Sequence, residues 1–254
     1  SGYSVEEVTL ENLRFNHGWL NPPLARALSV FMLTFVETEA RGAAVVRRCV
    51  DLVRSVAKDD AHAVLCSLES LEVAIKAMNH VFYRNIRTTL IDPAAWDEWI
   101  KPIYGWGLDA GDGTLEGASG LQLGSIQCAE AILGFENETF LSNAAIDSRK
   151  YMPVGHRRFL SVADAARPMV PRYIREHDSP LLTQRYNACI DSLRAWRQAH
   201  RQRGALYLRG NGAGSMAGST GMAISGCEHA AVDQFHALMQ ERIDETMKAH
   251  IVMA

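Results

Sequence analysis

Signatures of several common protein classes are missing from this chain of 254 residues. It contains no Gly-x-Ser-x-Gly and no His-Glu-x-x-His motif, so neither a serine hydrolase nor a zinc protease is indicated. Charged residues interrupt its apolar runs well before the about 20 residues that a membrane-spanning helix requires. The formal net charge is -3, and no basic patch is interleaved with aromatic residues. We therefore expect no membrane partner and no nucleic-acid partner.

Cysteines are few and form no Cys-x-x-Cys pair. The five of them are odd in number and scattered, and most lie in helical patterns, where a free cysteine behaves as a small apolar residue. This usage favours a reducing compartment, and we expect a cytoplasmic protein. With 48% hydrophobic and 22% charged residues, the chain is long enough for one large core or two modest domains.

Apolar residues recur at helical spacing through most of the chain, which predicts an all-α fold. One helix is expected from Leu24 to about Ala57, and Asp59 and Asp60 cap the next, which runs to about Thr89. These two long helices, joined by a tight acidic turn, should form an antiparallel hairpin. Further helices are expected at about 93–102, 121–135, 141–150, from Pro153 onward, and at 230–253.

The longest helical pattern runs from Ser179 to Leu208, with Ser179 as N-cap and Pro180 at the first helical position. One largely apolar face of this helix carries His200 together with Arg197 and Gly204. Glycine inside a helix costs about 1 kcal/mol relative to alanine, so Gly204 predicts that something flat and bulky approaches the backbone there. On periodicity alone, a hydrogen-bonded core histidine is the simpler interpretation of His200.

Two glycine-rich stretches, at 107–124 and 210–226, match neither a dinucleotide-binding fingerprint nor a phosphate-binding loop. The first offers close backbone approach to a ligand and a free hydroxyl at Ser119. The second is mobile or a lid over a site. Between the helices, the segment AAWDEWIKPIYGW contains several aromatic residues and one cation, Lys101. Its aromatic residues either pack the core or line a ligand.

The nine histidines never combine with Cys, Asp or Glu at the spacing of a metal cage. A large helical domain with one isolated histidine on an apolar helix face, nearby glycines and loose aromatic residues fits a haem pocket. In such a pocket the cofactor supplies the chemistry.

Three blocks of the sequence resemble the indoleamine 2,3-dioxygenase family, haem enzymes that open the indole ring of tryptophan. They are Lys150–Leu160 (KYMPVGHRRFL), Gly117–Phe135 (GASGLQLGSIQCAEAILGF) and Tyr186–Tyr207, in which a histidine follows a Tyr-x-x-Cys by eleven residues. The resemblance implies that residues 1–254 form a single all-helical haem-binding domain, a bundle like the large domain of the family. The family's small N-terminal domain is expected to be absent or trimmed.

The resemblance also implies roles for individual residues. His200 would be the proximal ligand of the iron of haem b, and Arg197, three residues earlier, would pair with a haem propionate. Ser119 would be the loop serine beside the haem, with a part in catalysis, and Gly204 would allow the haem to approach the helix. Molecular oxygen would be the second substrate.

Substrate contacts are implied at two further places. Lys101 stands where the family has an arginine that binds the substrate carboxylate, and it keeps the charge but loses the bidentate fork. Trp96 or a residue near Phe31 would stack on the indole. Ser219 and Thr220 loosely match the Gly-Thr-Gly-Gly-Thr loop that covers the substrate in the family.

The predicted function is a haem-dependent dioxygenase that inserts both atoms of O2 into the indole ring of tryptophan or a related indole. Its product would be of the N-formylkynurenine type. The alternative is a haem-binding helical protein that acts on a different aromatic substrate or has no catalytic activity, and that could need a partner chain to complete the site.

Overall fold

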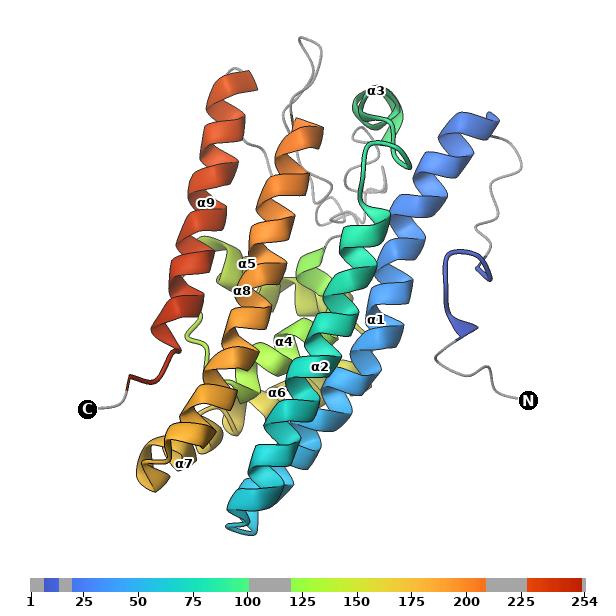
Figure 1. The fold of residues 1–254 in the computed structure, drawn as a ribbon. Coiled ribbons are helices and arrows are strands. Elements are labelled where there is room, and N and C mark those ends of the chain that lie inside the picture. The colour runs from blue at the N-terminus through green and yellow to red at the C-terminus, as the bar shows by residue number, and fades with distance from the viewer. Residues whose placement is uncertain (1–6, 14–19, 101–119, 209–227, 253–254) are drawn as a thin grey trace.

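The computed structural model describes residues 7–13, 20–100, 120–208 and 228–252. Within these ranges every regular element is helical, which confirms the predicted all-α fold. Four long helices stand side by side in the order α1, α2, α8, α9 (Figure 1). Their bounds are Pro22–Ala57 for α1, Ala61–Asn85 for α2, Pro180–Leu208 for α8 and Glu228–Lys248 for α9.

Shorter helices cover one side of this row. Helix α4 packs against α1 and α6, α5 packs against α9, and α7 contacts both α1 and α8. Figure 1 shows α4, α5 and α6 behind the long helices and α7 at the end where α8 begins. The bounds are Gly124–Ile132 for α4, Phe140–Asp147 for α5, Val154–Ala165 for α6 and Met169–His177 for α7.

Local capping explains where the first two helices begin. The side chain of Asn21 accepts a hydrogen bond from the Leu24 amide at 3.0 Å, and Asp60 accepts one from the Ala63 amide at 2.9 Å. Helices α1 and α2 therefore form the antiparallel hairpin predicted from the sequence.

Two helices end earlier than the sequence periodicity predicts, and a tertiary contact lies close to each end. Helix α2 ends at Asn85 rather than near Thr89, where the Asn85 side chain donates to buried Glu37 at 3.1 Å. Helix α9 ends at Lys248 rather than near Met253, because the side chain of Asn187 binds both the amide and the carbonyl of Ile251, at 3.0 and 2.9 Å. After α9 a side chain of α8 thus takes over main-chain hydrogen bonding, whereas at the end of α2 the contact joins two side chains.

The aromatic segment is not one regular helix. A single turn, α3 (Pro93–Ala95), is followed directly by a π-helical turn at Trp96–Ile100. The helix expected from Leu121 is likewise a short 3₁₀ turn, Gly120–Gln122, followed by α4 from Gly124. Glu39 of α1 accepts hydrogen bonds from the amide of Ser125 and, at 2.6 Å, from its hydroxyl, and thereby caps α4.

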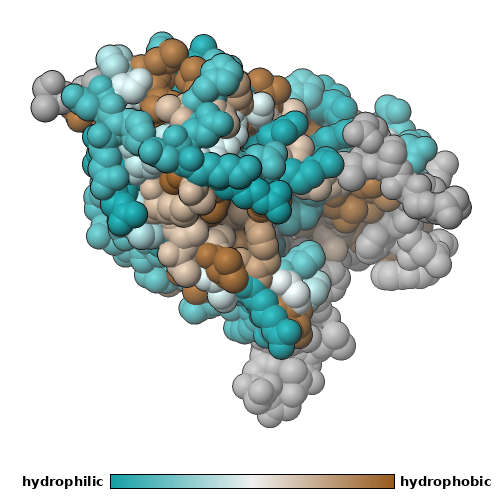
Figure 2. All heavy atoms as spheres, turned by 90° about the horizontal axis from the view of Figure 1, so that it is seen from below, coloured by the Kyte–Doolittle hydropathy of each residue, from teal (hydrophilic) through white to brown (hydrophobic). Residues whose placement is uncertain are grey.

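The outer surface is mostly hydrophilic with scattered apolar side chains. Figure 2, which looks at the end of the bundle where α1 turns into α2, shows apolar residues between hydrophilic ones. Among the described residues, Val162 of α6 and Phe140 of α5 are more than half exposed, at 68% and 56%. Single exposures of this kind are ordinary. No helix in the described ranges is both long enough and apolar enough to cross a membrane.

Gly42 lies where α1 and α4 pack closely together, so a substitution there should be costly. A Cβ atom on Gly42 would overlap Oγ and Cβ of Ser125, which Glu39 holds in place. We expect Gly42→Ala to force α1 and α4 apart and to lower the free energy of unfolding by about 1–3 kcal/mol. Chemical unfolding followed by circular dichroism measures this loss.

Gly155→Ala is the matched control, because a Cβ atom on this α6 residue would meet nothing within 4 Å. It should be neutral or stabilising by up to about 1 kcal/mol. Equal stability of the two variants would contradict the packing explanation for Gly42.

Candidate functional site

His200 lies on α8 between two phenylalanine rings. Phe82 of α2 and Phe235 of α9 each have a ring centroid 6.0 Å from that of the imidazole, in edge-on geometry. Among the described residues, neither imidazole nitrogen has a hydrogen-bond or ion-pair partner. A hydrogen-bonded core histidine is therefore not what the structure shows. The imidazole is an unpartnered polar group in aromatic surroundings.

Burial sets the protonation state of this histidine. The residue as a whole keeps some exposed surface, but loss of hydration around the ring lowers the pKa of His200 to about 4. The imidazole is consequently neutral at physiological pH. A neutral imidazole with a free nitrogen lone pair is the form that binds a metal ion.

The close approach to the backbone predicted at Gly204 is present, and the approaching group is an aromatic side chain of the protein itself. A Cβ atom on Gly204 would lie 2.7 Å from Cζ of Phe235, the same ring that meets His200. Gly204 thus lets a flat aromatic side chain of α9 lie against the face of α8 that carries the histidine. A role for Gly204 toward a cofactor stays a prediction.

Trp96 and Phe31, the two aromatic residues predicted to stack on a substrate, are in direct contact. Their ring centroids lie 4.7 Å apart, and the ring of Tyr207 of α8 also packs on Trp96, with 5.3 Å between centroids. Trp96 and Phe31 are each 8% exposed, so both contribute to the core. Whether they also hold an indole stays a prediction. Tyr207 connects this cluster to the C-terminal end of α8, the helix that carries His200.

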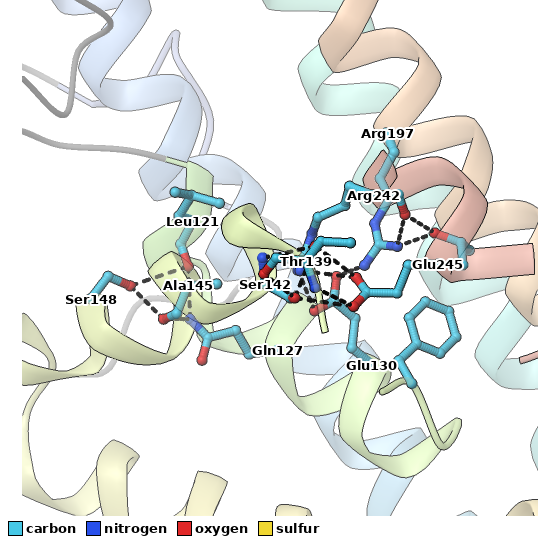
Figure 3. Close-up of polar contacts among 12 residues, drawn as sticks. Leu121, Gln127, Glu130, Thr139, Ser142, Ala145, Ser148, Arg197, Arg242 and Glu245 are labelled. Atoms are coloured by element: carbon cyan, nitrogen blue, oxygen red, sulfur yellow. Dashed lines mark hydrogen bonds and ion pairs between the residues drawn. The ribbon is translucent and has the colours of Figure 1, made fainter. Parts of the chain in front are cut away.

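Arg197 is buried among polar groups of α4 and α9 (Figure 3). Its guanidinium donates to Oε1 of Glu130 at 2.6 Å, to the carbonyl of Arg242 at 2.6 Å, and to the hydroxyl of Thr246. Only 4% of the residue is exposed. In the structure the carboxylate that pairs with Arg197 belongs to the protein itself, and its pairing with a haem propionate stays a prediction.

Glu130 and Glu245 balance the charge of two buried arginines. Glu130 also accepts from Arg242 at 2.9 Å, and Arg242 reaches Glu245 at 3.5 Å. Burial by itself would raise the pKa of Glu130, but Arg242 and Arg197 outweigh that effect and hold the pKa below its ordinary value. Glu245 in addition accepts the amides of Glu138 and Thr139, just before α5. We call these four charged residues, two acidic and two basic, the buried ion network.

A second polar contact holds the chain just after the first glycine-rich stretch. The side-chain amide of Gln127 donates to the carbonyls of Leu121 and Ala145, at 2.7 and 2.9 Å (Figure 3). Residue 121 is thereby tied to both α4 and α5.

Four predicted site residues lie outside the described ranges, and their roles stay predictions: Ser119, Lys101, Ser219 and Thr220. Conversely, sequence reasoning did not assign Phe82, Phe235 or Tyr207 to the site. The position of Tyr207, seven residues after His200 on one helix face, was a usable signal. The phenylalanines come from other helices and have no local signal.

The donor set restricts how His200 could hold a metal. The described part of the chain contains no group of three or more His, Cys, Asp or Glu side chains arranged to bind a metal ion. Protein cages for bare metal ions need about three or four such ligands. Within the described ranges His200 therefore offers a single protein ligand, which is what a metal already held by an organic ring requires.

A comparison with protein-family models places most of the chain in one family. The model described as indoleamine 2,3-dioxygenase matches residues 4–211. The chain belongs to the indoleamine 2,3-dioxygenase family. The match includes α1 to α8, and with them His200 and Arg197, whereas α9 lies beyond it. A search of the curated proteins found no match.

Indoleamine 2,3-dioxygenases are typically haem enzymes. Among the described residues, His200 fits the iron of a haem, whereas Arg197 is already paired and does not offer a free charge to its propionates. The unpartnered neutral imidazole of His200 suits an axial iron ligand, and an iron porphyrin needs only this one protein nitrogen on that side. The anionic edge of a haem has no free cation at Arg197, because Glu130 already pairs with it.

The buried ion network leads to a stability prediction. Glu130→Gln removes the carboxylate shared by Arg197 and Arg242, which leaves Arg197 without its ion-pair partner and Arg242 with Glu245 alone. Breaking a buried ion pair from one side costs about 3–5 kcal/mol, and we expect a loss of unfolding free energy of that order at pH 7. Glu241→Gln, at an exposed position of α9, should change it by less than about 0.5 kcal/mol.

The difference between the wild type and Glu130→Gln should depend on pH. A carboxyl whose pKa is lowered in the folded state stabilises the fold above the unfolded pKa of about 4.3, and this contribution disappears as the pH falls through the folded value. Urea unfolding at several pH values should therefore show the two proteins converging below about pH 4. A constant difference from pH 7 to pH 3 would contradict this.

Proposed function

We propose that the protein is a haem-dependent dioxygenase that adds both atoms of O2 to the indole ring of tryptophan or a related indole, giving an N-formylkynurenine-type product. Family membership supports haem dioxygenase activity. The observation that carries the proposal is the unpartnered, neutral imidazole of His200, with a pKa of about 4, on the helix included in the family match.

His200 would hold the iron of haem b from one side of the ring. When bound, the haem supplies the iron centre for chemistry with dioxygen. Phe82 and Phe235 shield the imidazole from water, and this keeps it neutral and ready to bind. Gly204 has no side chain of its own and so lets the Phe235 ring lie close to α8 beside the histidine.

Residues inside the described ranges and residues outside them would together hold the substrate. Lys101 follows the π-helical turn directly and would attract a substrate carboxylate by charge. Trp96 and Phe31 offer aromatic surface next to that turn. By resemblance, Ser119 would lie beside the haem, and Ser219 and Thr220 would belong to a loop over the substrate.

Arg197 has two possible uses that differ in their consequences. If it meets a haem propionate, it must share its charge with Glu130 or exchange one carboxylate for the other. If it stays with Glu130, its function is to join α8 to α4 and α9. The observed pairing with Glu130 supports the second use, and the first is the proposal that follows from the family.

One observation favours a second candidate function. Both aromatic residues proposed to hold the indole are 8% exposed and packed against each other. A haem-binding protein that takes a different aromatic substrate, or none, would be compatible with this packing. Such a protein could need a partner chain to complete the site.

Absorption spectroscopy tests the haem ligand. Purified protein supplemented with haem should develop a Soret band, which should shift on reduction with dithionite and addition of carbon monoxide. We expect His200→Ala to lose or strongly alter this spectrum, because no other described group replaces the imidazole. His156→Ala, an exposed position on α6, should leave it unchanged. Wild-type protein without any Soret band would contradict the proposal.

Turnover separates the two candidate functions. With ascorbate and methylene blue as reductants, the haem-loaded protein should convert tryptophan to a product with the ultraviolet absorption of N-formylkynurenine. A normal haem spectrum without turnover of tryptophan or simple indoles would contradict the dioxygenase proposal and support the second candidate function.

A further inference from the structure

Tyr207 is the side chain of α8 that contacts the segment carrying Trp96. Its hydroxyl donates to the carbonyl of Ile91 at 3.2 Å, and its ring packs on Trp96 with 5.3 Å between centroids. The residue is 6% exposed. Burial raises the pKa of Tyr207 to about 12, so the hydroxyl remains protonated and keeps its donor role throughout the physiological range.

The same helix face carries Tyr207 and His200. Seven residues separate them, which corresponds to two helical turns and about 10 Å along the axis. Tyr207 therefore connects two parts of the proposed site directly: the helix that would hold the haem iron and the segment 91–100 that leads to Lys101.

The segment 91–100 depends on contacts from outside itself. It consists of the single turn α3 and a π-helical turn, and π-helical turns are uncommon and often occur at functional sites. Two observed contacts from other helices hold it in place. The Tyr207 hydroxyl donates to the carbonyl of Ile91, and the Phe31 ring packs on Trp96 in T-shaped geometry. Ile91 is itself only 1% exposed.

We propose that Tyr207 is a positioning residue, which holds the segment 91–100 against α8 and so determines where an indole lies relative to the haem. A phenylalanine would keep the ring that packs on Trp96 and lose only the hydroxyl that binds the carbonyl of Ile91. The proposed positioning role therefore belongs to the hydroxyl. This inference rests on the proposed function, because it assigns the Trp96 and Lys101 segment to the substrate.

Tyr207→Phe tests the proposal, with Tyr186→Phe as the matched control. Tyr186 lies on the same helix, is fully buried, and donates to the carbonyl of Leu133 at 2.6 Å. Both variants lose one buried tyrosine hydroxyl that binds a main-chain carbonyl. A merely structural effect should therefore be similar in the two proteins.

Two measurements on the 254-residue protein distinguish positioning from stability. In the haem-loaded protein, Tyr207→Phe should raise the KM for tryptophan about fivefold, the effect of one lost hydrogen bond, with kcat and the ferrous carbon monoxide spectrum little changed. In the absence of tryptophan, amide hydrogen exchange in peptides that contain residues 91–100 should become faster. Tyr186→Phe should show neither change.

The outcomes separate this inference from the proposed function. Unchanged exchange at 91–100, or a KM that matches that of Tyr186→Phe, would overturn the role of Tyr207 even if the wild type consumes tryptophan. A wild type that neither binds nor consumes tryptophan would overturn the proposed function and the substrate role with it. In that case the exchange measurement still tells whether Tyr207 holds the segment.

Discussion

The buried ion network is the interaction on which the rest of the site depends. Ionised side chains are costly to remove from water unless each finds an opposite charge, and here two carboxylates and two guanidiniums meet with 8% or less of each side chain exposed. Glu130 comes from α4, Arg197 from α8, and Arg242 and Glu245 from α9. Because every partner is needed, the network determines how α8 is rotated between its neighbours.

That rotation decides the surroundings of His200. With Arg197 turned to α4 and α9, the histidine three residues later faces Phe82 and Phe235, and its imidazole has aromatic neighbours in place of hydrogen-bond partners. The polar and apolar halves of the site are thus two consequences of one helix orientation. The neutral histidine follows from it, since burial without a nearby charge lowers the pKa to about 4.

Much of this arrangement is predictable from local sequence, and the rest depends on contacts between distant segments. The hairpin of α1 and α2, the start of α8, and the close approach at Gly204 follow from periodicity, capping residues and a missing side chain. That the approaching ring would be Phe235 was not predictable, because α9 is separated from α8 by a long glycine-rich stretch. The pairing of Arg197 with Glu130 spans 67 residues and has no local pattern at all.

The central claim is that the imidazole of His200 is the group that binds the haem iron. It is tested most directly by haem titration of a His200→Gly variant, with and without free imidazole. We predict that the variant binds haem weakly and with an altered spectrum, and that added imidazole restores the wild-type ferrous and carbon monoxide spectra by entering the vacated space. A variant that shows the wild-type spectra without imidazole would contradict the claim.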